Sequence, residues 1–339
     1  MFPRVDSFVH PPDDTYPLFI TAKRYSEPQY PPLDNCSLTL ICLHSTSFPK
    51  EVWEPTLDSL FRISRDSRSP VQIREAWVIE CPNHGSSAVL NEDYFCHPAH
   101  SGRFGCRKYG LAVHRFLTSG PFSQLKHPGS LALVGHSLGA VASCFLRVLE
   151  PRLKFRLHII IEPAMTAGSG SAIHFLEFRR RAVVGAYERR DVWPSREEAR
   201  VAFKRSGWDS RVLDSFLEFG LRDHSGRRDA RMSYSGVTLA CTRDEEAGMY
   251  KDIDGPLDSV PLLKSICKEG PVHAIFGEIA DFIPVQTREA LCDPTSGCKF
   301  ASFSIMKDIG HIIPQVAPDR LAHEIQRILS IQVHPKPKL

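Results

Sequence analysis

The sequence contains no long apolar run. No stretch of its 339 residues approaches the roughly 18 consecutive apolar residues that cross a bilayer, so we expect no transmembrane segment. An excess of charge of one sign is also lacking, because 42 Lys and Arg stand against 39 Asp and Glu, a net charge of +3. So small an excess does not indicate binding to the phosphate backbone of a nucleic acid.

Closely spaced cysteine pairs are absent as well. The ten cysteines are scattered, and none forms the C-x-x-C pair that is typical of a zinc site. Cys42, Cys81 and Cys144 lie in apolar patterns, where a free thiol behaves as a small hydrophobic side chain. The first residues, rich in Pro and Asp, lack the apolar centre of a secretory signal. We therefore expect a reduced, intracellular protein with no metal.

Short apolar runs alternate with helical patterns along most of the chain. The runs that predict strands buried on both faces lie at residues 37–43, 75–80, 131–134, 157–161, 272–276 and 301–306. Alternation in this order predicts right-handed crossovers and a mainly parallel, doubly wound α/β sheet. Residues 1–35 are rich in proline, and we expect them on the surface, with one edge strand at residues 18–22.

The alternation stops after Ile161 and resumes near Pro271. Between them lies a charged and mostly helical segment. Because ligands of open α/β sheets bind at the carboxyl ends of the strands, a helical insertion there predicts a cap over the site. The predicted division is a discontinuous core of residues 1–162 and 270–333, a helical cap of residues 163–269, and a C-terminal tail of residues 334–339.

Arginine clusters in the insertion allow two interpretations. They lie at residues 179–181, 189–190 and 227–228. Such clusters are typical of solvated helix faces. The alternative is that they contact the phosphates of a charged substrate.

Residues 135–139 read Gly-His-Ser-Leu-Gly and join a predicted strand to a predicted helix. A G-x-S-x-G pentapeptide in that context is typical of a nucleophile elbow, a tight turn that lifts a serine hydroxyl above the sheet. The flanking glycines allow the strand and the helix to approach closely. The alternative is a purely structural Gly-Ser turn, and we favour Ser137 as a catalytic nucleophile.

A serine nucleophile needs a general base and an acid that orients the base. In the chain order Ser, acid, His, the predicted base is His311, which follows the last predicted strand and precedes a C-terminal helix. Glu162 and Asp281 both follow predicted strands, and the residues alone do not decide which of them is the acid. His84 precedes the serine in the chain, so we expect it to shape the site rather than act as the base.

An oxyanion hole needs two N–H donors beside the reacting carbonyl. One is expected from the backbone of Leu138, the residue after Ser137. The other is expected from the loop after the strand at residues 37–43, with Thr46 as the first choice and Ser47 as the second.

Four stretches carry a resemblance to a known family. They are residues 44–51 with 53–55, the elbow, residues 161–163 (Ile-Glu-Pro), and residues 191–197 (Asp-Val-Trp-Pro-Ser-Arg-Glu). With them the chain resembles the α/β-hydrolase superfamily. Within it, the chain is similar to a fungal secondary-metabolism group. That group includes the peroxisomal acyl-CoA hydrolase of mycophenolic acid biosynthesis and the hydrolases of host-selective toxin clusters.

The resemblance implies an α/β-hydrolase fold with a helical cap and a serine hydrolase without cofactor or metal. The implied reaction is cleavage of a small-molecule acyl-CoA thioester or a related acyl ester through an acyl-enzyme. The alternatives are a carboxylesterase or lactonase that does not use CoA, and a non-catalytic binding protein of the same fold. The resemblance places the triad acid at Glu162, with Asp281 as the alternative. Two departures are Ser45, where the family usually has Gly, and a glutamate in place of an aspartate.

The last three residues, Pro337-Lys338-Leu339, are a variant of the Ser-Lys-Leu peroxisomal address. A receptor reads this address at an exposed C-terminus, so the expected partner is the peroxisomal import receptor. The resemblance supports a peroxisomal location, and a cytoplasmic one is the alternative.

Overall fold

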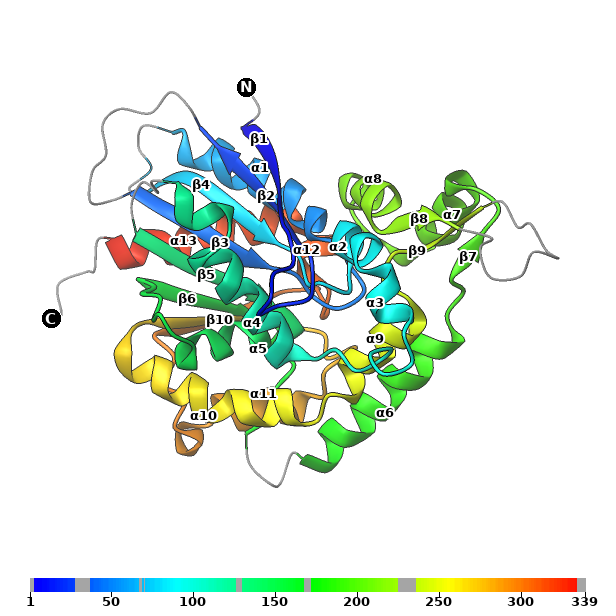
Figure 1. The fold of residues 1–339 in the computed structure, drawn as a ribbon. Helices are drawn as coiled ribbons and strands as arrows, with labels where there is room; N and C mark the ends of the chain where they lie inside the picture. The colour runs from blue at the N-terminus through cyan, green and yellow to red at the C-terminus, as the bar shows by residue number, and fades with distance from the viewer. Residues whose placement is uncertain are drawn as a thin grey trace, which may run out of the picture.

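A computed structural model describes residues 3–27, 37–66, 69, 71–125, 130–167, 172–224 and 236–333. An eight-stranded sheet runs through its centre, with helices on both faces (Figure 1). The strands, in spatial order, are β1 (Arg4–His10), β2 (Ile20–Ser26), β4 (Gln72–Ile79), β3 (Ser37–Leu43), β5 (Ser130–His136), β6 (Leu157–Ile161), β10 (Val272–Gly277) and β11 (Ser302–Met306). All neighbours from β4 to β11 pair in parallel, while β2 is antiparallel to both β1 and β4. The mainly parallel α/β sheet is therefore confirmed.

Two predictions near the N-terminus were wrong. β1 was not expected, because it has few apolar side chains and alternates between exposed and half-buried positions. β2 begins at Ile20 rather than at residue 18, and it is not an edge strand, because β1 pairs along its whole length. The burial of β2 comes from this added strand, a long-range pairing that a local pattern does not reveal.

Alternate residues of the central strands pack into two separate cores. In β3, Ile41 and Leu43 pack with the layer that contains α4 (Cys106–Thr118) and α5 (Leu138–Phe145). Leu40 and Cys42 point to the other face, where α1 (Glu54–Ser64) and α13 (Pro318–Val333) pack on each other. This alternation follows from the two-residue period of a strand. All seven residues of β3 are buried, so the strand that leads into the site is anchored on both sides.

The segment between β6 and β10 forms most of one side of the molecule in Figure 1. Its elements are α6 (Ala172–Glu188), β7 (Val192–Trp193), α7 (Arg196–Phe203), α8 (Ser210–Phe219), β8 (Leu221–Asp223), β9 (Val237–Leu239), α9 (Arg243–Lys251) and α10 (Asp254–Glu269). The three strands form a small antiparallel sheet in the order β7-β9-β8, which the sequence pattern did not predict. α10 packs against α5, within the helical layer of the main sheet.

Capping side chains fix where several of these helices begin. Ser195 accepts a hydrogen bond from the N–H of Glu198 at the start of α7, and Asp209 accepts one from Arg211 at the start of α8. The remaining short helices are α2 (Gly85–Leu90), α3 (Glu92–Cys96), α11 (Val285–Cys292), α12 (Ile313–Val316) and the 3-10 turns Lys50–Trp53, Pro121–Gln124, Leu146–Val148, Lys204–Ser206 and Pro294–Ser296.

None of the helices in the described ranges is long and apolar enough to span a lipid bilayer. The predicted targeting tripeptide at residues 337–339 and the arginines at 227–228 lie outside the described residues.

Candidate active site

Ser137 stands in the turn between β5 and α5 with φ of 54° and ψ of −119°. Such angles cost a non-glycine residue about 1–3 kcal/mol, so the surrounding chain must hold them in place. A Cβ atom at Gly135 would lie 2.7 Å from the Cα of Ala140, and one at Gly139 would lie 2.5 Å from the carbonyl oxygen of His44. Neither position has space for a side chain. The two glycines of the pentapeptide thus permit the strand and helix contacts that impose the strained turn on the serine.

His311 lies between a serine and a carboxylate. Its Nε2 is 2.9 Å from Ser137 Oγ, and its Nδ1 is 3.1 Å from Glu162 Oε2. All three residues are buried, with exposed fractions of 4% for Ser137, 5% for His311 and 7% for Glu162. With Nδ1–H donating to the carboxylate, Nε2 is free to accept the proton of the serine hydroxyl.

Glu162 follows β6 directly and is itself in a left-handed conformation, with φ of 46°. Its second oxygen, Oε1, accepts a hydrogen bond of 2.6 Å from the N–H of Gly277 at the end of β10. The carboxylate is therefore held between two neighbouring strands, with one oxygen on the main chain and the other on the imidazole.

Asp281, the alternative acid, contacts the same histidine at its main chain. Asp281 Oδ1 accepts a hydrogen bond of 2.8 Å from the N–H of His311. The carboxylate also packs so closely on Gly310 that a Cβ atom there would lie 2.0 Å from Asp281 Oδ2. The structure thus brings Glu162 to the ring of His311 and Asp281 to its backbone loop.

Thr46 and Ser47 line the same cavity as Ser137, but their N–H groups differ. The N–H of Ser47 donates to Nε2 of His84 at 2.9 Å, so it is already engaged. Among the described residues the N–H of Thr46 has no hydrogen-bond partner. Leu138 is the first residue of α5, where an N–H has no partner within the helix. The geometry thus leaves Leu138 and Thr46, the two first choices from the sequence, with available donors.

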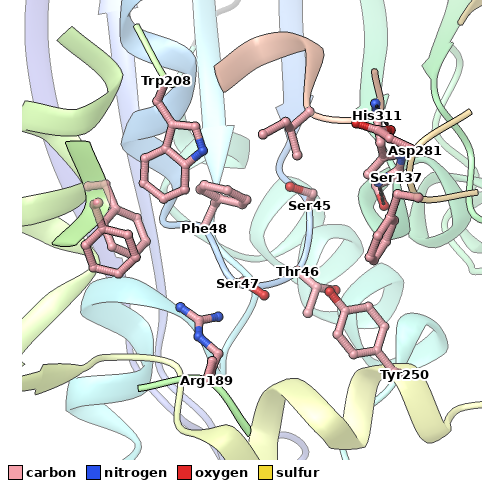
Figure 2. Close-up of a pocket in the computed structure, with 14 residues that line it drawn as sticks. Ser45, Thr46, Ser47, Phe48, Ser137, Arg189, Trp208, Tyr250, Asp281 and His311 are labelled. Carbon is pink, nitrogen blue, oxygen red and sulfur yellow. Dashed lines mark hydrogen bonds between the residues drawn. The ribbon is translucent and has the colours of Figure 1, made fainter. Parts of the chain in front are cut away.

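Two unexpected hydroxyls flank these donors. Ser45 Oγ and Thr46 Oγ1 are buried, and neither has a hydrogen-bond partner within the described part of the chain. Figure 2 shows both side chains at the edge of the cavity, near Ser137. The side chain of Ser45 therefore places a polar hydroxyl at this site, beside that of Thr46.

The loop of residues 45–47 is anchored by His84 and by a residue of the insertion. Ser47 has φ of 76°, and its hydroxyl donates a hydrogen bond of 2.6 Å to Glu246 Oε1 in α9. Glu246 Oε2 pairs with the guanidinium of Arg189, which follows α6. Sequence reasoning missed Glu246, because acidic residues in the first turn of a helix are common on helix surfaces. Arg189 belongs to one of the arginine clusters for which contact with a charged substrate was the alternative interpretation.

Three buried histidines around the site are neutral. Burial holds the pKa of His84 and of His136 well below the ordinary value, and it lowers the pKa of His44 to about 4. His84 Nδ1 then donates to Asn83 Oδ1, which leaves Nε2 to accept from Ser47. His84 therefore holds the loop through a fixed tautomer, as expected of a residue that shapes the site.

A cavity of about 370 Å³ lies over Ser137, between the core and the insertion (Figure 2). Its apolar wall consists of Phe48, Phe203, Trp208, Phe216, Phe282 and Ile312. Arg189 is the one cationic side chain that lines it among the described residues. Tyr250 lies beside the loop, and burial raises the pKa of its phenol.

The other described arginines of the predicted clusters do not line this cavity. Arg179 is buried, and its guanidinium donates to the carbonyl oxygen of Tyr250. Arg180 and Arg181 are exposed on α6. Across the described ranges, no group of three or more His, Cys, Asp or Glu residues is arranged to hold a metal ion.

Comparison with curated proteins gives partial matches. The chain is 30% identical over 208 residues to the type I acyl-CoA thioesterase mpaH of Penicillium brevicompactum, over 61% of this chain and 45% of that protein. It is 31% identical over 127 residues to the abhydrolase domain-containing protein AFT2-1 of Alternaria alternata, over 34% of this chain and 42% of that protein. Each match thus spans less than half of the relative's own length.

The fold has a counterpart among solved structures. The peroxisomal alpha-beta-hydrolase Lpx1 of Saccharomyces cerevisiae superposes with a TM-score of 0.75 at 19% identity, covering 100% of this chain and 91% of that one. The model of the alpha/beta hydrolase family matches residues 40–324, a range that includes the elbow, Glu162 and His311. From the elbow, the sheet order and this match together, we conclude that the chain belongs to the alpha/beta hydrolase family.

Proposed function

We propose that the chain is a serine hydrolase that cleaves an acyl thioester or ester through an acyl-enzyme. The observation that carries the proposal is the pair of hydrogen bonds made by His311, one to Ser137 and one to Glu162. A serine hydroxyl is a weak nucleophile until an adjacent base removes its proton, and this base is already in contact and oriented.

In this mechanism Ser137 Oγ attacks the substrate carbonyl while His311 Nε2 takes its proton. Glu162 stabilises the imidazolium that forms and keeps Nδ1 protonated. The N–H groups of Leu138 and Thr46 stabilise the oxyanion, which reaches full charge only after the attack. His311 returns the proton to the leaving group, and a water molecule activated by the same histidine releases the acid.

For the substrate we propose an acyl-CoA thioester of secondary metabolism. Two observations support it: the apolar wall of the cavity suits an acyl group, and the relative from Penicillium brevicompactum is named as an acyl-CoA thioesterase. A thiolate also leaves with less help from an acid than an amine does.

A carboxylesterase or lactonase that does not use CoA is the second candidate. It is favoured by the charge of the cavity, because Arg189, the one cationic lining residue in the described ranges, is already paired with Glu246. The described part of the cavity therefore has no unpaired cationic side chain to bind the phosphates of CoA.

We further propose that residues 163–269 act as the cap of this site, anchored to the core through the packing of α10 on α5. A peroxisomal location, reached through the import receptor and residues 337–339, stays a proposal. It is supported by the likeness in fold to Lpx1, a peroxisomal hydrolase of Saccharomyces cerevisiae.

The test measures acid release from acyl-CoA thioesters and from matched p-nitrophenyl esters, with Ser137→Ala as the control. Hydrolysis of both classes that is lost in Ser137→Ala is the expected result. Turnover of esters alone would establish the second candidate. Absence of all turnover, together with no labelling of Ser137 by a fluorophosphonate, would overturn the proposal.

A further inference from the structure

Arg189 is a cation in a cavity whose other walls are mainly aromatic. Its side chain is 23% exposed, and it follows α6 directly. Figure 2 shows the guanidinium across the cavity from Ser137 and His311, with Ser47 between them and Phe48 and Trp208 on the opposite wall. A charged group in such surroundings is costly unless it is paired and hydrogen-bonded. The contacts of Arg189 therefore decide what the far end of the cavity can bind.

Glu246 is the one side chain among the described residues that accepts a hydrogen bond from Arg189. It is nearly fully buried, and its other oxygen accepts the hydroxyl hydrogen of Ser47. Because both carboxylate oxygens are engaged, Glu246 fixes the guanidinium in place. A guanidinium has five N–H donors, and this contact uses Nη1 alone. Donors therefore remain for a ligand in the cavity.

The charge of the pair decides which ligand group is favoured. Arg189 and Glu246 together are neutral, so repulsion by Glu246 would offset part of the attraction between Arg189 and a second carboxylate placed there. A neutral oxygen suffers no such repulsion and still accepts a charge-assisted hydrogen bond. A plain alkyl group would leave the remaining guanidinium donors without a partner.

We propose that Arg189 binds a neutral oxygen acceptor, such as a hydroxyl, keto or ether oxygen, at the far end of the substrate's acyl group. This subsite selects oxygenated acyl groups over plain alkyl groups of the same length. The inference rests on the proposed function and specifies its substrate class, because the apolar wall receives the acyl body and Ser137 receives the carbonyl.

The test compares kcat/KM for p-nitrophenyl octanoate with a series of esters of the same length that carry one hydroxyl or keto group at carbons 5 to 8. A hydrogen bond to a charged donor predicts a preference of about tenfold to a hundredfold for at least one oxygenated ester. Arg189→Met is expected to reduce that ratio to near one. Arg180→Met is the matched control, because Arg180 is exposed on α6, the helix that precedes Arg189, and it is expected to keep the ratio.

Glu246→Gln provides a second, independent variant. It leaves the charge of Arg189 uncompensated. We therefore expect a gain in kcat/KM for the mono-p-nitrophenyl ester of octanedioic acid, whose far end is a carboxylate, relative to kcat/KM for p-nitrophenyl octanoate in the same variant. Thermal unfolding of each variant shows whether it is folded, and Glu246→Gln carries the test alone if Arg189→Met does not fold.

Three results would overturn the subsite. They are equal kcat/KM for all esters in the unaltered protein, an unchanged ratio in Arg189→Met, and no gain on the carboxylate ester in Glu246→Gln. Turnover of p-nitrophenyl octanoate separates this failure from failure of the proposed function. If octanoate is cleaved in a Ser137-dependent way, only the subsite is refuted, and if no ester or thioester is cleaved, both are refuted.

Discussion

The hydroxyl of Ser47 donates a hydrogen bond to Glu246 across 199 positions of sequence, from the loop after β3 to helix α9 of the insertion. The same serine uses its N–H on His84, which belongs to the core. The loop that carries Thr46 is therefore held from both sides. Any change in how the insertion sits on the core changes this loop as well.

This relationship predicts an energetic coupling that a double-mutant cycle can measure. Ser47→Ala removes the hydroxyl, and Glu246→Met removes its acceptor. We expect each single variant to lower kcat about threefold to thirtyfold with little change in KM, because the loop acts on the oxyanion formed after binding. The double variant should be little worse than either single one, since contacting residues are not additive. Fully additive losses in kcat would show that the two residues act independently.

If Glu162 is the acid, replacing the carboxylate of Glu162 by an amide lowers kcat far more than the same replacement at Asp281. Glu162→Gln removes the charge that orients the His311 ring, so kcat should fall on the order of 10³-fold to 10⁴-fold. Asp281→Asn keeps an oxygen that can accept the N–H of His311, so kcat should fall less than about tenfold. Steady-state kinetics of both variants decides the question. The opposite order of losses would make Asp281 the acid.

The close contacts at the elbow predict that Gly139→Ala unfolds more easily and is inactive. Its new Cβ atom would overlap the main chain of His44, at a cost of about 1–3 kcal/mol in the free energy of unfolding, with loss of the turn that presents Ser137. Gly185→Ala is the matched control, because nothing lies within 4 Å of its Cβ position in α6. Replacing that helical glycine should stabilise the protein by about 0.5–1 kcal/mol. Urea unfolding measures both, and equal stabilities would contradict the argument.

Two neutral histidines, the buried His44 and the half-buried His158, predict that the free energy of unfolding falls in mild acid. Burial lowers the pKa of His44 and of His158 to about 4, whereas each has the ordinary value of 6.5 once the chain unfolds. Between these values the unfolded chain binds more protons than the folded one, so the free energy of unfolding decreases as pH drops below 6.5. Each such shift corresponds to about 3 kcal/mol at most.

Urea unfolding at pH 7.5, 6.0 and 5.0 checks this dependence. We expect a constant free energy of unfolding above about pH 7 and a steady decrease below pH 6.5. His158→Gln should show a smaller decrease, because it no longer takes up a proton on unfolding. A free energy that is flat or that rises as the pH drops would contradict the assignment of neutral histidines.

The sequence predicts the parts of the site that are local. Ser137 lies in a pentapeptide with its own structural context, and His311 was selected by its place after the last strand. The choice of acid is different, because Glu162 and Asp281 both lie in the chain that follows a strand. Their roles depend on which of the two carboxylates contacts the imidazole ring of His311 and which contacts its main chain. The N–H of Gly277, in the strand beside β6, holds one oxygen of Glu162 and so helps to position the other. The residue pattern of two strands that are distant in the sequence does not give the distances between side chains at their ends.

Other features could not be predicted from local sequence patterns, because they also depend on contacts between distant parts of the chain. β1 becomes a strand through its pairing with β2 rather than through an apolar pattern. Arg189 and Glu246 meet across the insertion, and neither belongs to a motif. The unpartnered hydroxyls of Ser45 and Thr46 follow from how tightly the loop packs on the elbow, which depends on the three-dimensional fold.

Glu162 is fixed at the last point before the chain leaves the sheet, and the chain returns at β10, the strand that pairs directly with β6. The insertion therefore begins and ends at two neighbouring strands. Because these strands are parallel, it leaves at the carboxyl end of β6 and re-enters at the amino end of β10. Its length and shape can change while the two attachment points stay where they are, because lengthening such a loop costs little free energy. The chemistry and the substrate pocket can thus evolve separately, with Glu162, the proposed triad acid, at the border between them.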